Sequence, residues 1–342
     1  MIEKRNSAGR GIAFSMVAMC LAPAALGQPA DPEKLIEAGH WKQARAVVEA
    51  RLRQAPGDPL ANFFLSQVRN AFGERTTPLP LAEKAVALGP GVAKYHRQLA
   101  EVLGVQAQHA GAIQQLLLAR RFRKEVDLAL ALDPRDVQAL RDLLEFYLLA
   151  PGIAGGDSRK AAETAQRIGE LDAPQGFLAG ARIAEFHRQT SEAALELRRA
   201  AQAQPPSYRA RVELARFCLA PEHSDPRAAE SAAKEALSLD RGRVDAYSVL
   251  ADVYAGGAEW SPLDAILTEA SRQVPDDLTP YYRAADRLLS AGRDPARAER
   301  YLRTYLGEEP EGNEPPASEA RQKLRAGGGG PRPPGRRRCH SE

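Results

Sequence analysis

The side chains that most often carry out catalysis or bind metal ions are scattered along this chain. Its 342 residues include six histidines and three cysteines. Acid–base and metal sites group such residues on one helix face with a carboxylate, a spacing that no two of the histidines show. These are His40, His96, His109, His187, His223 and His340. No serine lies in a nucleophile elbow, and no histidine is spaced so as to pair with Cys218 or Cys339. We therefore predict no catalytic residue, no metal ligand and no cofactor, and a protein that is not an enzyme.

One glycine-rich segment could cradle an anion with its backbone N–H groups. It runs from Gly152 to Gly156 but lacks the lysine and hydroxyl pair of a phosphate loop. We interpret it as a turn, with Asp157 or Ser158 capping the next helix. Cys218 falls on the inner face of an expected helix, which favours a buried thiol over a reactive one.

The strongest pattern in the sequence is a repeat. Its markers are Pro56, Pro90, Pro134, Pro174, Pro205, Arg241, Pro275 and Pro310, at steps of 34, 44, 40, 31, 36, 34 and 35 residues. A period in this range is typical of stacked structural units rather than of a domain with a single core.

Small residues recur at fixed distances from the markers. Five residues before them lie Ala85, Ala129, Gly169, Ala200, Ala236 and Ala270, and twelve before lie Ala44, Ala162, Ala193, Ala229 and Ala298. An apolar residue followed by a small one comes nine and ten residues after most markers. These spacings predict two amphipathic helices per unit, packed through small side chains, with the proline ending the second helix.

On these residues the chain resembles the tetratricopeptide repeat family. The segment ALALDP at 129–134, the run AAKEALSLD at 232–240, and Gly39 with Trp41 and Ala44 match the pattern of its turn and second helix. The resemblance covers roughly residues 31–310 and implies an all-α, right-handed superhelical α-solenoid, which we place at residues 28–310. We expect an incomplete first unit, in which Asp31 to Ala38 supplies only a short first helix, and then seven full units that end near Pro310.

Two insertions interrupt the period. The 44-residue step adds about two or three turns of helix between Gly104 and Phe122. The 40-residue step contains the glycine-rich turn. Beyond Pro310 the pattern ends, because the register would place Glu319 beside Ala320 in the apolar seam. For residues 311–342 we expect a polar closing helix at 317–326, then a flexible basic tail. A change of reading frame would produce a similar loss of pattern.

The resemblance also implies a concave groove, lined by first helices, that binds a peptide or protein. Its positions map to Lys94, Arg97, Glu101, Gln138, Arg141, Glu145, Ala181, Glu185, Arg188, Arg209, Val212, Arg216, Asp245, Ser248, Asp252, Tyr282 and Asp286. The groove should be basic near Arg209 to Arg216 and acidic from Asp245 to Asp286. At any single position we favour pairing along the same helix, as Arg97 with Glu101 and Arg141 with Glu145, over contact with a ligand. The carboxylate-clamping pattern of chaperone-binding members is absent.

Residues 1–27 match a secretory signal peptide. Lys4, Arg5 and Arg10 precede an apolar stretch, and Ala25 with Gly27 form a cleavage site before Gln28. An uncleaved anchor is the alternative. Lipid attachment at Cys20 is disfavoured by Met19. We expect a periplasmic or secreted bacterial protein.

The net charge gives little direction. The chain carries +3. Residues 28–310 carry −2, because the first 27 and the last 32 residues are basic. A near-neutral body argues against nucleic-acid binding. We predict a non-catalytic adaptor that holds a protein or peptide partner in its groove. The alternative is an assembly subunit of an envelope or secretion complex that docks through the long helix around 106–126. The sequence does not indicate an oligomeric state.

Overall fold

The structure, a computed structural model, describes residues 30–312 and 315–327, which form one compact unit. These residues form seventeen α-helices and one 3₁₀ turn, and they contain no strand. The predicted signal peptide and the basic tail beyond residue 327 lie outside the described residues. None of the helices described is both long and apolar enough to span a membrane.

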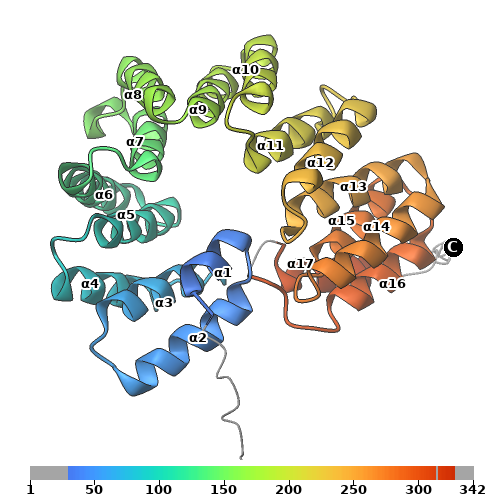
Figure 1. The fold of residues 1–342 in the computed structure, drawn as a ribbon, viewed down its shortest axis with the longest axis horizontal. Helices are drawn as coiled ribbons and strands as arrows, with labels where there is room; N and C mark the ends of the chain where they lie inside the picture. The colour runs from blue at the N-terminus through green and yellow to red at the C-terminus, as the bar shows by residue number, and fades with distance from the viewer. Residues whose placement is uncertain (1–29, 313–314, 328–342) are drawn as a thin grey trace, which may run out of the picture. The chain divides into compact units, whose positions relative to one another are not determined.

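Seven helix pairs follow a short first pair, as the repeat predicts. The helices are α1 (Pro32–Ala38), α2 (Trp41–Gln54), α3 (Pro59–Ala71), α4 (Pro78–Leu88), α5 (Ala93–Gln108), α6 (Ala112–Leu132), α7 (Val137–Leu149), α8 (Ser158–Leu171), α9 (Ala173–Phe186), α10 (Thr190–Gln202), α11 (Tyr208–Leu219), α12 (Pro226–Leu239), α13 (Val244–Gly257), α14 (Trp260–Gln273), α15 (Thr279–Ser290), α16 (Pro295–Tyr305) and α17 (Ala317–Gly327). Most pack mainly on their neighbours in sequence, whereas α13 packs mainly on α15, the first helix of the next unit. Together they form the predicted α-solenoid (Figure 1).

The helix ends follow the markers. α2, α4, α6, α12 and α14 each end two residues before a marker, where the next turn begins. Asp58 caps α3 by accepting a hydrogen bond from the Leu60 N–H at 2.9 Å. Asp136 likewise accepts from the Ala139 N–H at 3.0 Å at the start of α7. Such carboxylates satisfy backbone donors that would otherwise lack a partner within the helix.

The predicted small residues form the contact between paired helices. Ala44, Ala85, Ala129, Ala193, Ala200, Ala229, Ala236 and Ala298 are fully buried. Ala162 is exposed, so its predicted packing role is wrong, and Ala161 is buried in its place. The cause is the marker Pro174, which lies in the first turn of α9 and does not end α8. Because α8 and α9 share Asp172 as a cap, no turn residues separate them and the register slips by one.

A close backbone approach lies between the same two helices. A Cβ added at Gly176 would overlap the Cα of Gly169. Two glycines therefore bring α8 and α9 together where an alanine could not fit. This contact fixes the direction of α9, which lies on the inner side of the curve with α5, α7 and α11 (Figure 1).

Both insertions have the predicted form. α6 has 21 residues against 14 for α8, an extension of about two turns, although the chain turns between Gln108 and Ala112 and does not run as one helix from 106 to 126. The glycine-rich segment is a 3₁₀ turn at Gly152–Ala154, and Asp157 caps α8.

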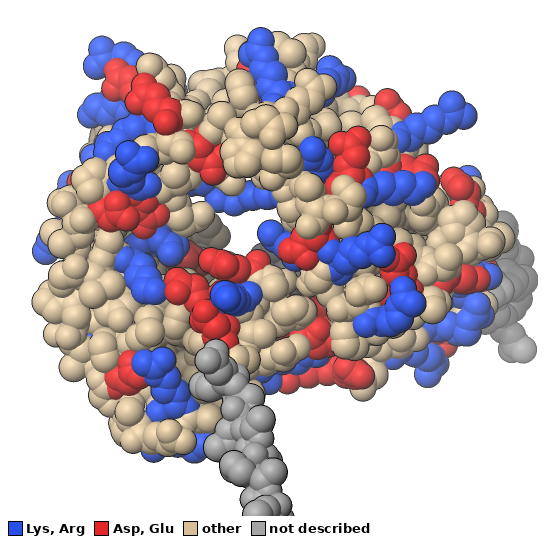
Figure 2. All heavy atoms as spheres, in the orientation of Figure 1, with Lys and Arg blue, Asp and Glu red and all other residues tan. Residues whose placement is uncertain are grey.

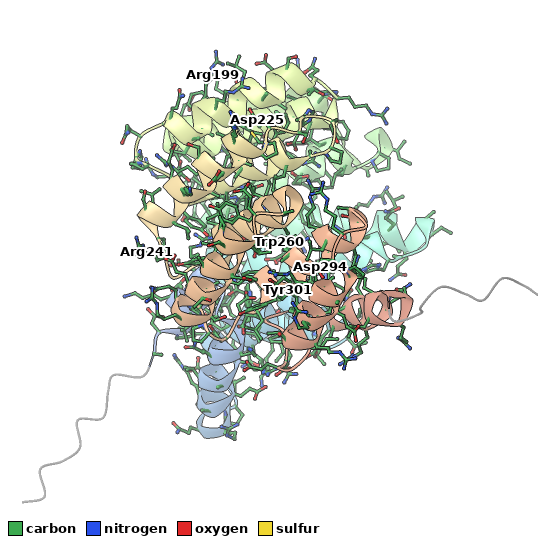
Figure 3. The ribbon with its side chains drawn as sticks, turned by 90° about the vertical axis from the view of Figure 1, so that its right-hand side faces the viewer. Arg199, Asp225, Arg241, Trp260, Asp294 and Tyr301 are labelled. Carbon is green, nitrogen blue, oxygen red and sulfur yellow. The ribbon has the colours of Figure 1, made fainter. Side chains whose placement is uncertain are left out.

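The last helix, α17, matches the predicted closing helix and covers the end of the array. Ala320 is fully buried, and Glu319 accepts a hydrogen bond from the Tyr282 hydroxyl at 2.7 Å. The carboxylate therefore replaces the apolar residue that the register requires. On the second helices nearby, Trp260 and Tyr301 lie close together (Figure 3). The Arg297 guanidinium lies 4.6 Å from the centre of the Trp260 ring, which joins α14 to α16.

Candidate functional site

The candidate site is a cavity of about 320 Å³ between the first helices of three successive units. α7 and α9 present to it the residues four, seven, eight and eleven positions after their markers, and α11 presents those four, eight and eleven positions after Pro205. The lining is Gln138, Arg141, Asp142, Leu144, Glu145, Leu178, Ala179, Ala181, Arg182, Leu197, Glu185, Arg209, Glu213, Arg216 and Phe217. The predicted residues that meet here are Gln138, Arg141, Glu145, Ala181, Glu185, Arg209 and Arg216.

The sequence mapping missed one charged position per helix, namely Asp142, Arg182 and Glu213. It also missed the apolar lining residues Leu144, Leu178, Ala179, Leu197 and Phe217. Each charged position lies four residues after one predicted position or three before another. It therefore shares their helix face. The spacing of three and four residues from the predicted groove positions on each first helix is the sequence signal that could have identified them.

The predicted pairing of charges along each helix is wrong. Glu145 accepts two hydrogen bonds from Arg182 of α9, at 2.8 and 2.9 Å, and not from Arg141. Arg97 lies 3.4 Å from Asp136, while Glu101 accepts a hydrogen bond from Asn70 at 3.0 Å. Successive first helices lie side by side along the inner side of the curve. The carboxylates of one helix are therefore within reach of the cations of the next.

Two arginines of the cavity lack such a partner. Among the described residues, no carboxylate oxygen lies within 4 Å of a side-chain nitrogen of Arg141 or Arg209. Arg141 donates only to the Gln138 amide oxygen, at 2.9 Å. Burial and the positive charge of Arg209 lower the pKa of Arg141 to about 10. Burial also lowers the pKa of Arg209. The two guanidinium groups therefore repel each other in a poorly hydrated space, an arrangement that a bound anion would relieve.

The carboxyls of the cavity are also perturbed. Burial, helped by the charge of Glu101, raises the pKa of Asp142 to about 7. Burial raises the pKa of Glu185 as well. A proton on Asp142 near neutral pH leaves the unpaired arginines with less negative charge nearby.

The other predicted groove residues lie elsewhere. The Lys94 ammonium lies 3.1 Å from Glu33 and holds α1. Arg188 has a left-handed backbone after the end of α9 and does not line the cavity. Val212 and Ser248 are buried.

The acidic end of the predicted groove is neutralised or covered. Asp245 lies 2.6 Å from Arg216, Asp252 lies 3.2 Å from Arg287, and Asp286 lies 2.6 Å from Lys323 of α17. Tyr282 is 1% exposed. The prediction that Tyr282 lines an accessible groove is therefore wrong, because α17 covers it. Asp286 is 38% exposed but is paired with Lys323 of α17.

The remaining chemistry is sparse. No group of three potential metal ligands occurs within residues 30–312 and 315–327. Cys218 is half-buried, and burial raises the pKa of its thiol. A raised pKa disfavours the reactive thiolate.

Comparison with known proteins adds evidence on the fold. No family model matches the sequence, and no curated protein sequence matches it. Among solved structures, yeast Tom70 matches with a TM-score of 0.55 at 15% identity, over 87% of this chain and 61% of that one. This likeness supports a fold like that of tetratricopeptide repeat arrays, an α-solenoid of helical repeats. At this identity the likeness shows the fold alone, and the chain covers less than two thirds of Tom70.

Two further structures of tetratricopeptide repeat proteins are similar to parts of the array. One, a thermophilic protein from Thermus thermophilus, matches with a TM-score of 0.48 at 19% identity, over 55% of this chain and 95% of that one. Another, from Parabacteroides merdae, matches with a TM-score of 0.42 at 11% identity, over 87% and 96% of the two chains.

Proposed function

We propose that this chain is a non-catalytic scaffold of the cell envelope that binds a protein or peptide partner in the cavity between α7, α9 and α11. The observation that carries the proposal is the pair Arg141 and Arg209, two cations without carboxylate partners in one cavity. The other charged groups of the first helices are mostly paired with neighbouring helices. A ligand that binds two unpaired arginines does not have to displace an ion pair of the folded chain, so more of the contact energy is available for binding.

The cavity favours a carboxylate of the partner over a more highly charged group. A guanidinium fork matches a carboxylate in two parallel hydrogen bonds. Glu185 flanks the pair and would oppose a second negative charge on the ligand. Leu178, Ala181 and Phe217 offer apolar surface beside the arginines. A short acidic segment with an adjoining apolar side chain fits this combination.

Crosslinking in the native compartment tests the proposal. A photoreactive phenylalanine at Glu185, which is exposed and lines the cavity, should capture the partner. The double variant Arg141→Ala with Arg209→Ala should lower capture about tenfold or more, because a charge-assisted hydrogen bond contributes roughly 1.5–3 kcal/mol. The matched control is Arg159→Ala with Arg199→Ala, on outer helices. Equal capture by both double variants would refute the role of the cavity.

The envelope location rests on residues 1–27. Maturation at the predicted site would give a protein that begins at Gln28. Sequencing the N-terminus of the protein from a cell fraction tests this. A lipid-bearing N-terminus at Cys20, or retention of residues 1–27, would contradict it.

One observation favours the alternative, an assembly subunit that docks through α6. The extension of this helix leaves Ile113 82% and Leu117 57% exposed, one turn apart on the same face. Replacing both by aspartate should abolish assembly into a complex and leave capture at Glu185 unchanged. Loss of capture by the arginine variant alone would favour the groove proposal instead.

A further inference from the structure

The first unit of the array contacts its last turns. The His40 Nδ1 atom lies 2.9 Å from the Asp276 carboxylate, which also accepts a hydrogen bond from the Gln43 amide at 2.8 Å. Asp276 lies in the turn between α14 and α15, more than 230 residues further along the chain. A solenoid in which each unit packs only on its neighbours would leave these residues apart.

A second set of contacts joins α2 to the segment after α16. The Lys42 backbone N–H donates to Glu311 at 2.5 Å, and the Lys42 ammonium donates to the Glu309 carbonyl at 2.8 Å. Arg45 donates two hydrogen bonds to the Glu309 carboxylate, at 3.0 and 2.6 Å. We call these contacts the seam, formed by His40, Lys42, Gln43 and Arg45 with Asp276, Glu309 and Glu311.

The seam differs from the helix packing that holds successive units of the array together. Within residues 30–312 and 315–327, each cluster of buried apolar side chains joins helices near in sequence, and none includes side chains from both sides of the seam. Besides His40 with Asp276, two ion pairs cross the seam. Arg45 and Glu309 are 25% and 55% exposed, whereas Lys42 and Glu311 are 19% and 0% exposed. Exposed ion pairs contribute little and are screened by salt, whereas apolar helix packing is not.

The seam also decides how the inner side of the array is reached. Figure 2 shows an opening through the middle of the unit, bordered by charged side chains. α7, α9 and α11, which carry the candidate cavity, lie on the inner side of the curve (Figure 1). With the seam formed, the helices follow one another around this space without an open end.

We propose that the seam is a latch that opens and closes on the folded array and controls access to its inner side. Opening exchanges polar contacts for water and leaves each helix pair intact. Closing encloses a segment that lies along α7, α9 and α11. The opening itself does not rest on the proposed function, whereas the enclosure of a partner does.

Pulsed EPR distances across the seam test the latch on the full chain. Spin labels replace Gln54 of α2 and Thr304 of α16, both exposed, after Cys20, Cys218 and Cys339 are changed to serine. A short distance should dominate at about 50 mM salt, and a longer one should appear at about 0.5 M, where the screening length falls severalfold. A control pair at Gln166 and Gln202, on neighbouring outer helices, should not change.

A charge exchange separates a latch from general loosening. Arg45→Glu should shift the distances to the longer population at low salt, and Arg45→Glu combined with Glu309→Arg should restore the short one. Circular dichroism should stay unchanged in each variant. A long distance in the unchanged seam at low salt would mean that the seam does not form. One short distance in every variant and at every salt would mean that it never opens. Either result overturns the proposal.

A tether tests the gating of access separately. Cysteines at Arg45 and Glu309, joined by a short bifunctional maleimide, should hold the seam closed. Tethering before exposure to the partner should lower crosslinking at Glu185 by about tenfold, while the same cysteines left untethered should not. Equal crosslinking would refute gating. Loss of crosslinking in both samples would mean that the cysteine substitutions themselves impair capture. The variant Arg45→Glu with Glu309→Arg then serves instead, and its capture should equal that of the unchanged protein.

Discussion

Two walls of the array have similar rows of charged residues on their first helices but differ in how those charges are used. On α7, α9 and α11, Arg141 and Arg209 face a cavity without carboxylate partners. On α13 and α15, Asp252 and Asp286 are held by cations of the next helix. The first wall can accept a ligand, whereas the second is already occupied by its own chain.

The difference arises from the helix that packs next to each wall. Among the described residues no second helix follows α17, and α17 covers α15 through its contacts with Tyr282 and Asp286. A terminal unit of a repeat array needs such a polar cover. The lesson is that a groove position becomes a binding position only if the neighbouring unit leaves it unpaired.

The largest expected effect separates buried from accessible positions. Tyr282→Ala removes a ring that packs 5.3 Å from that of Tyr305 and a hydroxyl bonded to Glu319. It should lower the free energy of unfolding by about 3 kcal/mol, the cost of truncating a buried aromatic side chain. Urea denaturation followed by circular dichroism measures it. Arg141→Ala should change stability by less than about 0.5 kcal/mol. Similar losses in both variants would contradict the contrast between the walls.

A second change tests the packing behind the accessible wall. Gly176→Ala places a Cβ against the backbone of Gly169, so α8 and α9 must separate. We expect a loss of about 1–3 kcal/mol, typical of overpacking. Gly57→Ala, where the added Cβ meets no atom within 4 Å, is the control and should be nearly neutral. Thermal unfolding of the two variants gives the comparison, and a neutral Gly176→Ala would show that the two helices adjust without cost.

The smallest expected effect depends on pH. Burial holds the pKa of Asp142 near 7, above its ordinary value of 3.8, so the folded chain binds a proton that the unfolded chain releases. The stability contributed by this group is therefore full below about pH 4 and is lost as pH rises through 7. Asp142→Asn should stabilise the protein on the order of 1 kcal/mol at pH 8 and have little effect at pH 4.

The same exchange on the covered wall should have the opposite sign. Asp286→Asn removes the contact with Lys323, which is 27% exposed, and should cost a few tenths of a kcal/mol at pH 8. Denaturation midpoints at pH 4 and pH 8 measure both variants. Equal responses of Asp142→Asn and Asp286→Asn to pH would remove the distinction between the walls.

Part of the site was predictable and part was not. The offsets from the markers placed Gln138, Arg141 and Arg209 on one face because helical periodicity fixes which residues share a face. The same offsets also predicted that Tyr282 lines the groove, although it is buried under α17. After Pro310 the repeat pattern places Glu319 at a position that is usually apolar. The spacing alone does not predict that this carboxylate accepts a hydrogen bond from the Tyr282 hydroxyl.

The sequence by itself determined the fold, because a repeated spacing of small and apolar residues requires paired helices that stack on their neighbours. It also determined the long α6 and the capped turn before α8, since both follow from local composition. The pairing of charges between first helices, the covering of α15 by α17 and the seam between Arg45 and Glu309 were decided only by the tertiary structure. These contacts join residues far apart in sequence, and they depend on the accumulated curvature of the array, which no single repeat specifies.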